Sequence, residues 1–203
     1  MNLLIDELPT SVFIDGVSYE INTDYRIGIM FETMMLDSEI SDEDKLKKAL
    51  NLFFGHNIPD DLSAAVDKIM WFYDCGKRKD NGSRRRRRKV EKKRVYDYDY
   101  DDAYIYAAFL QQYGVDLQDE FLHWWKFKAM FRSLSDNTEF VKIMGYRSIK
   151  ITPSMTKSQR EFYKEMQDIH ALPLPQNEVD KKRAIEEALL NGGDVASILS
   201  GGG

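Results

Sequence analysis

Aromatic side chains at helical spacing dominate one stretch of this chain, residues 96–151. Within it, apolar and aromatic residues recur every three or four positions, the spacing that places side chains on one face of an α-helix. Gly114 interrupts the pattern and is a typical residue at a helix end. We therefore expect one helix that begins at Asp101 and a second helix from about Asp116 to Ser133.

The second of these helices carries more large rings than one buried face needs. Adjacent residues on a helix point about 100° apart, so Trp124 and Trp125 cannot face the same direction. Core packing is the favoured interpretation of this cluster. Rigid rings are also typical of binding hot spots, and methionine makes adaptable contacts. The candidate partner-binding residues are therefore Trp125, Phe127, Met35 and Met130.

Residues 11–22 predict a β-hairpin. Apolar side chains alternate along two short segments on either side of Asp15-Gly16, and this dipeptide supplies the positive φ angles of a two-residue type I′ turn. Two strands alone are marginally stable in water. The hairpin therefore needs helices over its apolar face or further strands from a partner, and it is a candidate contact between neighbouring copies.

Three further helices are expected between the hairpin and Gly76, with N-caps at Thr23, at Ser41, and at Asp60 or Asp61. Two more are expected later in the chain, before the C-terminal arm. The side chains expected on buried faces are Ile27, Met30, Phe31 and Met34 on the first helix, Leu62, Val66, Ile69, Met70 and Tyr73 on the third, and Phe162, Met166 and Ile169 on the last.

The predicted fold is mainly α with a small N-terminal β-hairpin. The two late helices span 138–144, which Gly145 is expected to end, and 157–171. Residues 1–172 are predicted to form a single compact helical domain. Residues 173–203 are predicted to form a linker and a C-terminal helical arm, because prolines stop the last helix and glycines loosen the end of the chain.

Length and composition favour a globular protein. The chain has 203 residues, of which 43% are hydrophobic, enough for one well-buried core. Its single cysteine, Cys75, cannot form an internal disulfide, and the amino terminus lacks the features of a secretory signal. No apolar run approaches the roughly 20 residues that span a bilayer. We expect a cytosolic protein with no membrane role.

The formal net charge of −5 hides one strongly basic segment. Residues 77–94 hold twelve Lys and Arg against two carboxylates, a net charge of +10, which leaves −15 on the rest of the chain. We expect 77–95 to be a disordered, solvated loop, because like charges repel and apolar periodicity is absent. Contact with an acidic protein surface or with phosphate is less favoured. The residues concerned are Arg84, Arg85, Arg86, Arg87 and Arg88.

The sequence contains no recognisable catalytic or metal-binding motif. His56, His123 and His170 lie far apart, and Cys75 has no second cysteine nearby. The acidic run 97–102 lacks the Gly and the Glu that a calcium loop needs at its sixth and twelfth positions. It fits a capped helix start that pairs with the basic loop. A Cys75–His123 nucleophilic pair stays open, but a buried thiol is favoured. We expect no enzyme, no metal and no cofactor.

Four motifs occur in order along the chain: LPTSVFIDGVSYEINTDYR, DDAYIYAAFLQQYGVDL, LHWWKFKAMF and IMGYRSI. Together they resemble the phage gene-product-fifteen family of siphophage tail modules in Gram-positive hosts, over about residues 8–35 and 96–172. The Arg-rich insertion and the glycine-ended tail depart from the family pattern, so neither inherits a role from the resemblance.

The resemblance implies a non-enzymatic tail assembly chaperone that binds the tape measure protein in several copies during tail construction. The implied partners are the tape measure protein and other copies of this chain or a second tail assembly chaperone, with no membrane contact. The hairpin and residues 178–199 are candidates for contacts between copies. We expect the protein in the host cytoplasm and not in the mature virion. The alternatives are a structural tail or tail-completion component and a nucleic-acid-binding protein that uses the Arg-rich loop.

Overall fold

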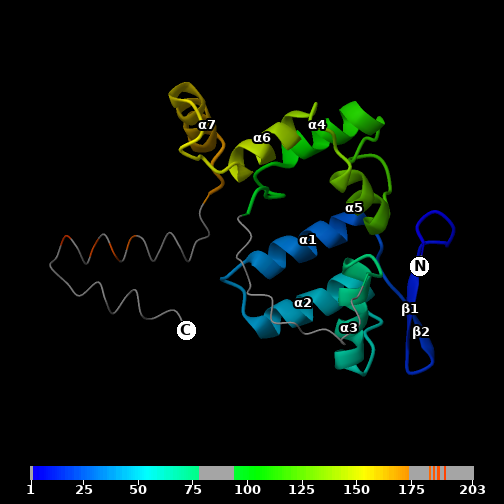
Figure 1. Ribbon diagram of the computed structural model, residues 1–203. Helices are drawn as coiled ribbons and strands as arrows, with labels where there is room; N and C mark the ends of the chain where they lie inside the picture. The colour runs from blue at the N-terminus through cyan, green and yellow to red at the C-terminus, as the bar shows by residue number, and fades with distance from the viewer. Residues whose placement is uncertain are drawn as a thin grey trace.

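The computed structural model describes residues 2–77 and 94–173, together with positions 183, 185, 187 and 190. The predictions for Arg84 to Arg88 lie outside the described residues, and those for the C-terminal arm lie largely outside them. The described residues form a hairpin and seven helices, which confirms the mainly α fold (Figure 1). The elements are β1 (Ser11–Ile14), β2 (Val17–Glu20), α1 (Tyr25–Leu36), α2 (Asp42–Phe54), α3 (Leu62–Tyr73), α4 (Asp102–Tyr113), α5 (Trp124–Arg132), α6 (Glu139–Ser148) and α7 (Lys157–Ile169).

The predicted hairpin is present with the predicted turn. Strands β1 and β2 pair antiparallel, and Ile14 lies opposite Val17. Asp15 and Gly16 have φ angles of 50° and 80°, as a two-residue turn of this type requires. Val12 is buried together with Ile14, so the inner face of β1 is covered by the rest of the fold.

The caps of the first three helices are close to those predicted. Ser41 caps α2 and Asp61 caps α3, and each side chain accepts a hydrogen bond from a backbone amide of the first turn. The cap of α1 is Asp24 rather than Thr23. The reason is tertiary, because the Thr23 carbonyl accepts a hydrogen bond from the backbone amide of Trp124 and is held in an extended pairing.

The helix predicted from Asp116 to Ser133 is wrong in its first half, because α5 begins only at Trp124. Asp116 instead closes a local turn onto the amide of Gln118. The carbonyl of Leu117 accepts hydrogen bonds from the Tyr25 hydroxyl and from Arg26, at 2.6 Å in each case. These partners lie about ninety residues earlier in the chain, so local spacing could not reveal that they divert this backbone from a helix.

Of two faces predicted to be buried, that of α3 is buried only in part and that of α7 is not buried. Helix α3 buries Ala65, Ile69 and Phe72, whereas Leu62 and Met70 are exposed, so its core face is rotated from the predicted one. Helix α7 has the predicted position, but none of its residues is buried. It packs against α6 at one end of the molecule (Figure 1). The apolar spacing therefore predicted the position of α7 but not the extent of its burial.

Helix α6 is longer than predicted. It runs through Gly145 to Ser148, where the sequence suggested an end at the glycine. A side chain at position 145 would meet no atom within 4 Å, so the glycine serves no close approach there. The extension brings Arg147 into the protein interior, where it is buried.

The core is continuous across two groups of elements. In Figure 1, α1, α2 and α3 lie together beside the hairpin, and α4, α6 and α7 lie on the opposite side of α5. Helix α5 packs against α1. It reaches α4 through Phe127, whose ring stacks on that of Phe109 with centroids 5.0 Å apart. The aromatic-rich helix of the sequence is therefore the central element of the core.

Candidate functional site

Two of the candidate partner-binding residues belong to the core, as the favoured interpretation of the aromatic cluster expected, and this argues against their role as exposed binding anchors. Trp125 is 4% exposed and Phe127 is fully buried. The indole of Trp125 donates a hydrogen bond of 2.7 Å to the Phe72 carbonyl, and the ring of Phe127 stacks on Tyr25. Neither ring is available to a partner of the folded protein, because the neighbouring helices already cover both faces of α5.

The two predicted methionines lie on different elements. Met35 is exposed near the end of α1, where its backbone carbonyl accepts a hydrogen bond from Lys45. Met130 is partly buried on α5, and its carbonyl accepts a hydrogen bond from the Tyr113 hydroxyl. Neither residue lines either of the two surface grooves described below. Their role in partner binding stays a prediction.

An apolar groove runs between α1 and α2 and has a volume of about 610 Å³. Met34 at its base is buried, whereas Met30 on its wall is 53% exposed. Helical spacing creates the groove, because positions three and four apart on α1 face α2 across it. Its lining is Ile29, Met30, Thr33, Met34, Asp37, Ile40, Lys48, Asn51, Leu52 and Asp99. Sequence spacing had assigned Met30 to the core, so this site was missed.

The polar side chains around the α1–α2 groove have an acidic balance. Among the described residues that line the groove, Asp37 and Asp99 supply two carboxylates against the single ammonium group of Lys48. Both Asp99 and Lys48 are exposed to solvent. An apolar floor with a net negative rim favours an apolar ligand with a basic flank, because complementary rim charge selects partners and speeds their encounter.

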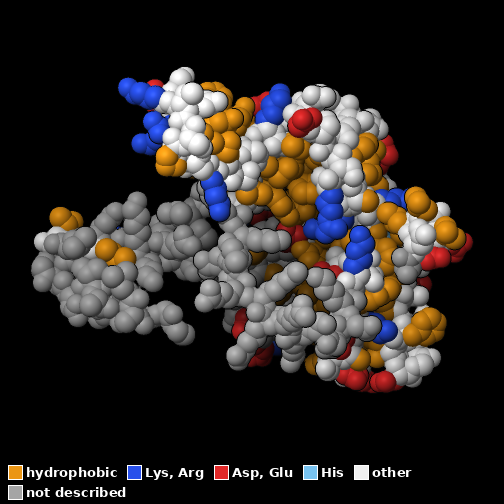
Figure 2. Space-filling view, viewed as in Figure 1, with side chains coloured by type: hydrophobic (Ala, Val, Ile, Leu, Met, Phe, Trp, Pro, Cys, Tyr) orange, Lys and Arg blue, Asp and Glu red, His pale blue; other side chains and the backbone are white. Residues whose placement is uncertain are grey.

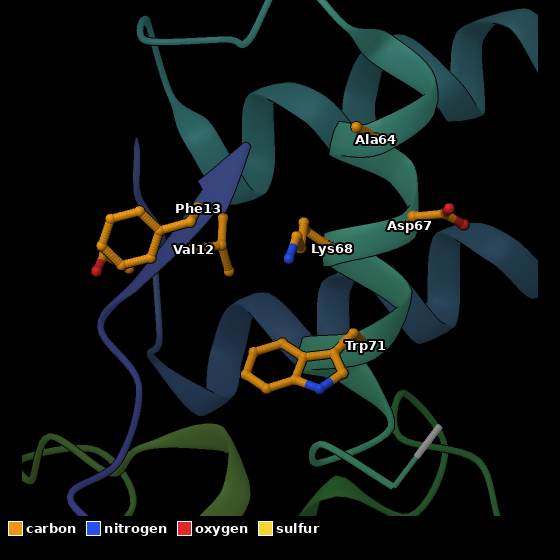
Figure 3. Close-up of a pocket in the computed structure, with 7 residues that line it drawn as sticks. Val12, Phe13, Ala64, Asp67, Lys68 and Trp71 are labelled. Carbon is orange, nitrogen blue, oxygen red and sulfur yellow. The ribbon is translucent and has the colours of Figure 1, made fainter. Parts of the chain in front are cut away.

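A second groove of about 440 Å³ lies between β1 and α3 (Figure 3). Lys68 and Trp71 extend from α3 toward the strand, whereas the Asp67 side chain points away on the far side of the helix. Val12 faces the groove from the strand, and the ring of Phe13 points away from α3. The groove thus combines an aromatic wall, a cationic side chain and one side of a β-strand.

A cluster of polar groups around Glu32 connects α1, α3 and α5. Its carboxylate accepts hydrogen bonds from the hydroxyls of Tyr73 and Tyr96, and the ammonium of Lys128 lies 3.4 Å away. Burial, together with the charge of Glu32, raises the pKa of Tyr96 to about 12. Tyr96 therefore keeps its proton at neutral pH. The groups are paired with one another, which is typical of a structural ion cluster.

The Cys75–His123 nucleophilic pair, which the sequence left open but did not favour, has no free base. One ring nitrogen of His123 accepts a hydrogen bond from the Trp125 amide, and the other lies 3.1 Å from the Pro9 carbonyl. Burial raises the pKa of the Cys75 thiol, which keeps the thiol protonated and poorly nucleophilic. Among the described residues, no group of three or more His, Cys, Asp or Glu side chains is placed to hold a metal ion.

The acidic run 97–102 is engaged in structural contacts. Asp97 pairs with Arg94, at the described edge of the basic segment. Asp101 is fully buried and binds Arg147 through two hydrogen bonds of 2.6 and 2.9 Å. The sequence predicted an acidic helix start but gave no sign of this buried ion pair, because its two residues lie 46 positions apart.

Figure 2 shows apolar side chains on the visible face in separate areas, over α7, between α4 and α6, and near the amino-terminal end beside the hairpin. Leu4 and Ile5 at that end are 92% and 79% exposed. In the part of the chain that the structure describes, no helix is long and apolar enough to cross a membrane.

Comparison with known protein families gives a match that covers most of the chain. A family model described as Bacteriophage Gp15 protein matches residues 4–172. No curated protein and no solved structure matches the chain. The matched range begins before the hairpin and ends after α7, so it includes both grooves.

Proposed function

The chain belongs to the bacteriophage Gp15 family, and from this membership we propose that it is a tail assembly chaperone that binds and solubilises the tape measure protein in several copies. The family confirms the resemblance found in the sequence motifs, and it is not a known enzyme family. It suggests a protein associated with the phage virion. The chaperone role is more specific than this, and it concerns tail assembly, before the virion is complete.

The observation that carries the proposal is the apolar groove between α1 and α2. A tape measure protein is expected to be a long, helix-rich chain with apolar stripes, which would aggregate if left exposed to water. A groove with Met30 on its wall and Met34 at its base is suited to such a client, because flexible thioether side chains adapt to different apolar surfaces. Repeated weak binding along one client would hold it without irreversible affinity.

The acidic balance of the groove rim predicts which client segments bind best. Asp37 and Asp99 outnumber Lys48, so a client helix with Lys or Arg beside its apolar stripe gains a favourable charge contact. A helix with acidic flanks would be repelled. This charge preference lets the chaperone distinguish between client segments that share the same apolar pattern but differ in the charge of their flanks.

The proposal is tested by co-expressing this chain with the tape measure protein of its own phage. Size-exclusion chromatography with light scattering would measure the mass of any complex. We expect a soluble complex with several copies of this chain per client. A client that stays insoluble while this chain elutes alone would contradict the proposal. Recovery of this chain from purified virions would favour the structural tail component instead.

A pair of variants tests whether the groove is the client site. Met30→Glu places a charge on the exposed groove wall, and we expect it to weaken client binding at least about tenfold. Leu110→Glu is the matched control, because Leu110 is an exposed apolar residue on α4 outside the groove. Both are apolar-to-acidic changes on exposed helix positions, so their folding costs should be similar. Equal client binding by the two variants would exclude the groove.

A further inference from the structure

The open edge of β1 carries unpaired backbone hydrogen-bonding groups. The Ile21 amide donates to the Thr10 carbonyl, and hydrogen-bonded pairs alternate along an antiparallel ladder. The backbone N–H and C=O groups of Thr10, Val12 and Ile14 therefore point toward β2. Those of Ser11 and Phe13 point to the opposite side, away from β2. Among the described residues, no hydrogen bond occupies these outward groups of Ser11 or Phe13.

This open edge faces the groove between β1 and α3. Three consecutive β1 residues, Ser11 to Phe13, line the groove and no β2 residue does, so the groove lies on the side of β1 away from its partner strand. Because the ring of Phe13 points away from α3 in Figure 3, Phe13 offers its backbone to the groove. An open strand edge beside a groove can bind an extended peptide, which adds to the sheet as a further strand.

The side chains of α3 specify what kind of peptide fits. Ala64 and Trp71 give the groove an apolar wall. Lys68 reaches toward β1 (Figure 3), and its ammonium has neither an ion pair nor a hydrogen bond within the described part of the chain. A half-buried, unpaired ammonium favours a carboxylate on the ligand. The fitting segment is extended and carries both apolar and acidic residues.

The amino-terminal segment of this chain has this composition. Residues 3–7 read Leu-Leu-Ile-Asp-Glu, and Leu3, Leu4 and Ile5 are all exposed. Three consecutive exposed apolar residues are unusual unless a partner covers them. Their turn is held by hydrogen bonds within residues 2–6, so opening it breaks only local contacts.

Strand geometry makes the fit independent of register. Alternate residues of a strand face the same side. One register would put Leu3, Ile5 and Glu7 toward the groove, and the other would put Leu4 and Asp6 there. Each set combines an apolar side chain for the wall with a carboxylate for the ammonium of Lys68.

We propose that residues 3–7 of a second copy of this chain bind as an added strand along the open edge of β1, with apolar side chains against α3 and a carboxylate on Lys68. Two copies can each bind the amino-terminal segment of the other and form a dimer, or each copy can bind the segment of the next and form a chain. This binding supplies the contact between neighbours that a multi-copy coat needs. The inference does not depend on the identity of the client, and its test contains no client, so either proposal can fail without the other.

Charge reversal across the interface tests the proposal with the full chain. Sedimentation equilibrium over a range of concentrations measures self-association of the wild type, which we expect to be reversible. Lys68→Glu should weaken self-association at least about tenfold, and so should the double variant Asp6→Lys with Glu7→Lys. A mixture of the two variants should associate again, because each groove then meets a segment of opposite charge.

Proline substitution tests the backbone pairing with a matched control. Ser11→Pro removes an N–H from the open edge of β1 without touching the ladder to β2, so we expect at least about a tenfold loss of association. Ser18→Pro removes the equivalent N–H from the open edge of β2, and association should persist. Circular dichroism and thermal unfolding of each variant show whether the fold is kept.

Three outcomes would overturn the inference. The wild type could stay monomeric over the whole concentration range, the mixed charge variants could fail to associate while both remain folded, or the two proline variants could associate equally well. Association restored in the mixture, together with loss confined to Ser11→Pro, would support it.

Discussion

At the scale of single residues, His123 joins the amino-terminal segment to the core. Its Nδ1 accepts a hydrogen bond of 3.1 Å from the Trp125 amide and thereby caps α5. Its Nε2 lies 3.1 Å from the Pro9 carbonyl. Only the neutral ring with its hydrogen on Nε2 satisfies both contacts. Burial lowers the pKa of His123 from its ordinary value of 6.5, consistent with this neutral form.

This geometry predicts that stability falls at acidic pH. The unfolded chain takes up a proton on His123 near pH 6.5, whereas the folded chain resists it to lower pH. The contribution of His123 is therefore complete above about pH 6.5 and is lost as pH falls toward its folded pKa, with a slope of up to about 1.4 kcal/mol per pH unit. Urea unfolding at several pH values measures the slope.

His123→Asn is the control for the pH dependence. An asparagine keeps a side-chain acceptor at the cap position and does not titrate. We expect its unfolding free energy to vary less between pH 7.5 and 5 than that of the wild type. Identical pH profiles for the two proteins would show that His123 does not carry the acid sensitivity.

At the scale of elements, the crossing of α1 and α5 depends on a single glycine. A Cβ at Gly28 would lie 2.2 Å from Cε3 of Trp124, closer than side chains pack. The ring of Trp124 is fully buried and its indole donates a hydrogen bond to the Tyr73 carbonyl, so it has little freedom to move away. Close contact of these two helices therefore requires glycine at this position.

Gly28→Ala should destabilise the protein by about 3 kcal/mol, because overpacking forces either the helix or the indole to shift. Gly145→Ala on α6 is the matched control, since a Cβ there meets no atom within 4 Å. Alanine favours a helix over glycine, so this second change should be neutral or stabilising by up to about 1 kcal/mol. Thermal unfolding of both variants tests the difference, and equal melting temperatures would contradict it.

At the scale of the whole molecule, Arg147 connects segments that are distant in the sequence. Its guanidinium binds both carboxylate oxygens of Asp101 at the start of α4. It also donates to the carbonyls of Val95 and His170, at 3.1 and 2.6 Å. One side chain on α6 thus holds the beginning of α4, the segment before it and the end of α7.

Asp101→Asn should destabilise the protein by about 3–5 kcal/mol, because it leaves the buried charge of Arg147 without its counter-ion. Glu161→Gln provides the comparison, since Glu161 and Lys157 form an exposed pair 3.8 Å apart on α7. Loss of an exposed pair of this kind costs about 0.5 kcal/mol or less. Chemical unfolding measures both changes, and similar losses would show that the buried pair is not a central link.

Local patterns in the sequence were sufficient to predict most of the elements and much about where they lie. A local pattern records interactions that act within a few residues. Such interactions account for the Asp15-Gly16 turn, the caps at Ser41 and Asp61, and the position of α7. The ordered motifs also sufficed to indicate the phage family that the match over residues 4–172 shows.

Which surfaces are left for binding depends on tertiary packing, which local patterns do not record. Trp125 and Phe127 combine the features of interface anchors, but the packing of α1, α3 and α4 around α5 buries both. The Asp101–Arg147 pair joins residues that are far apart in the chain. The α1–α2 groove and the open edge of β1 are left uncovered by the elements packed around them. Hydrophobic spacing measures how apolar a face is, whereas its exposure depends on which distant element covers it.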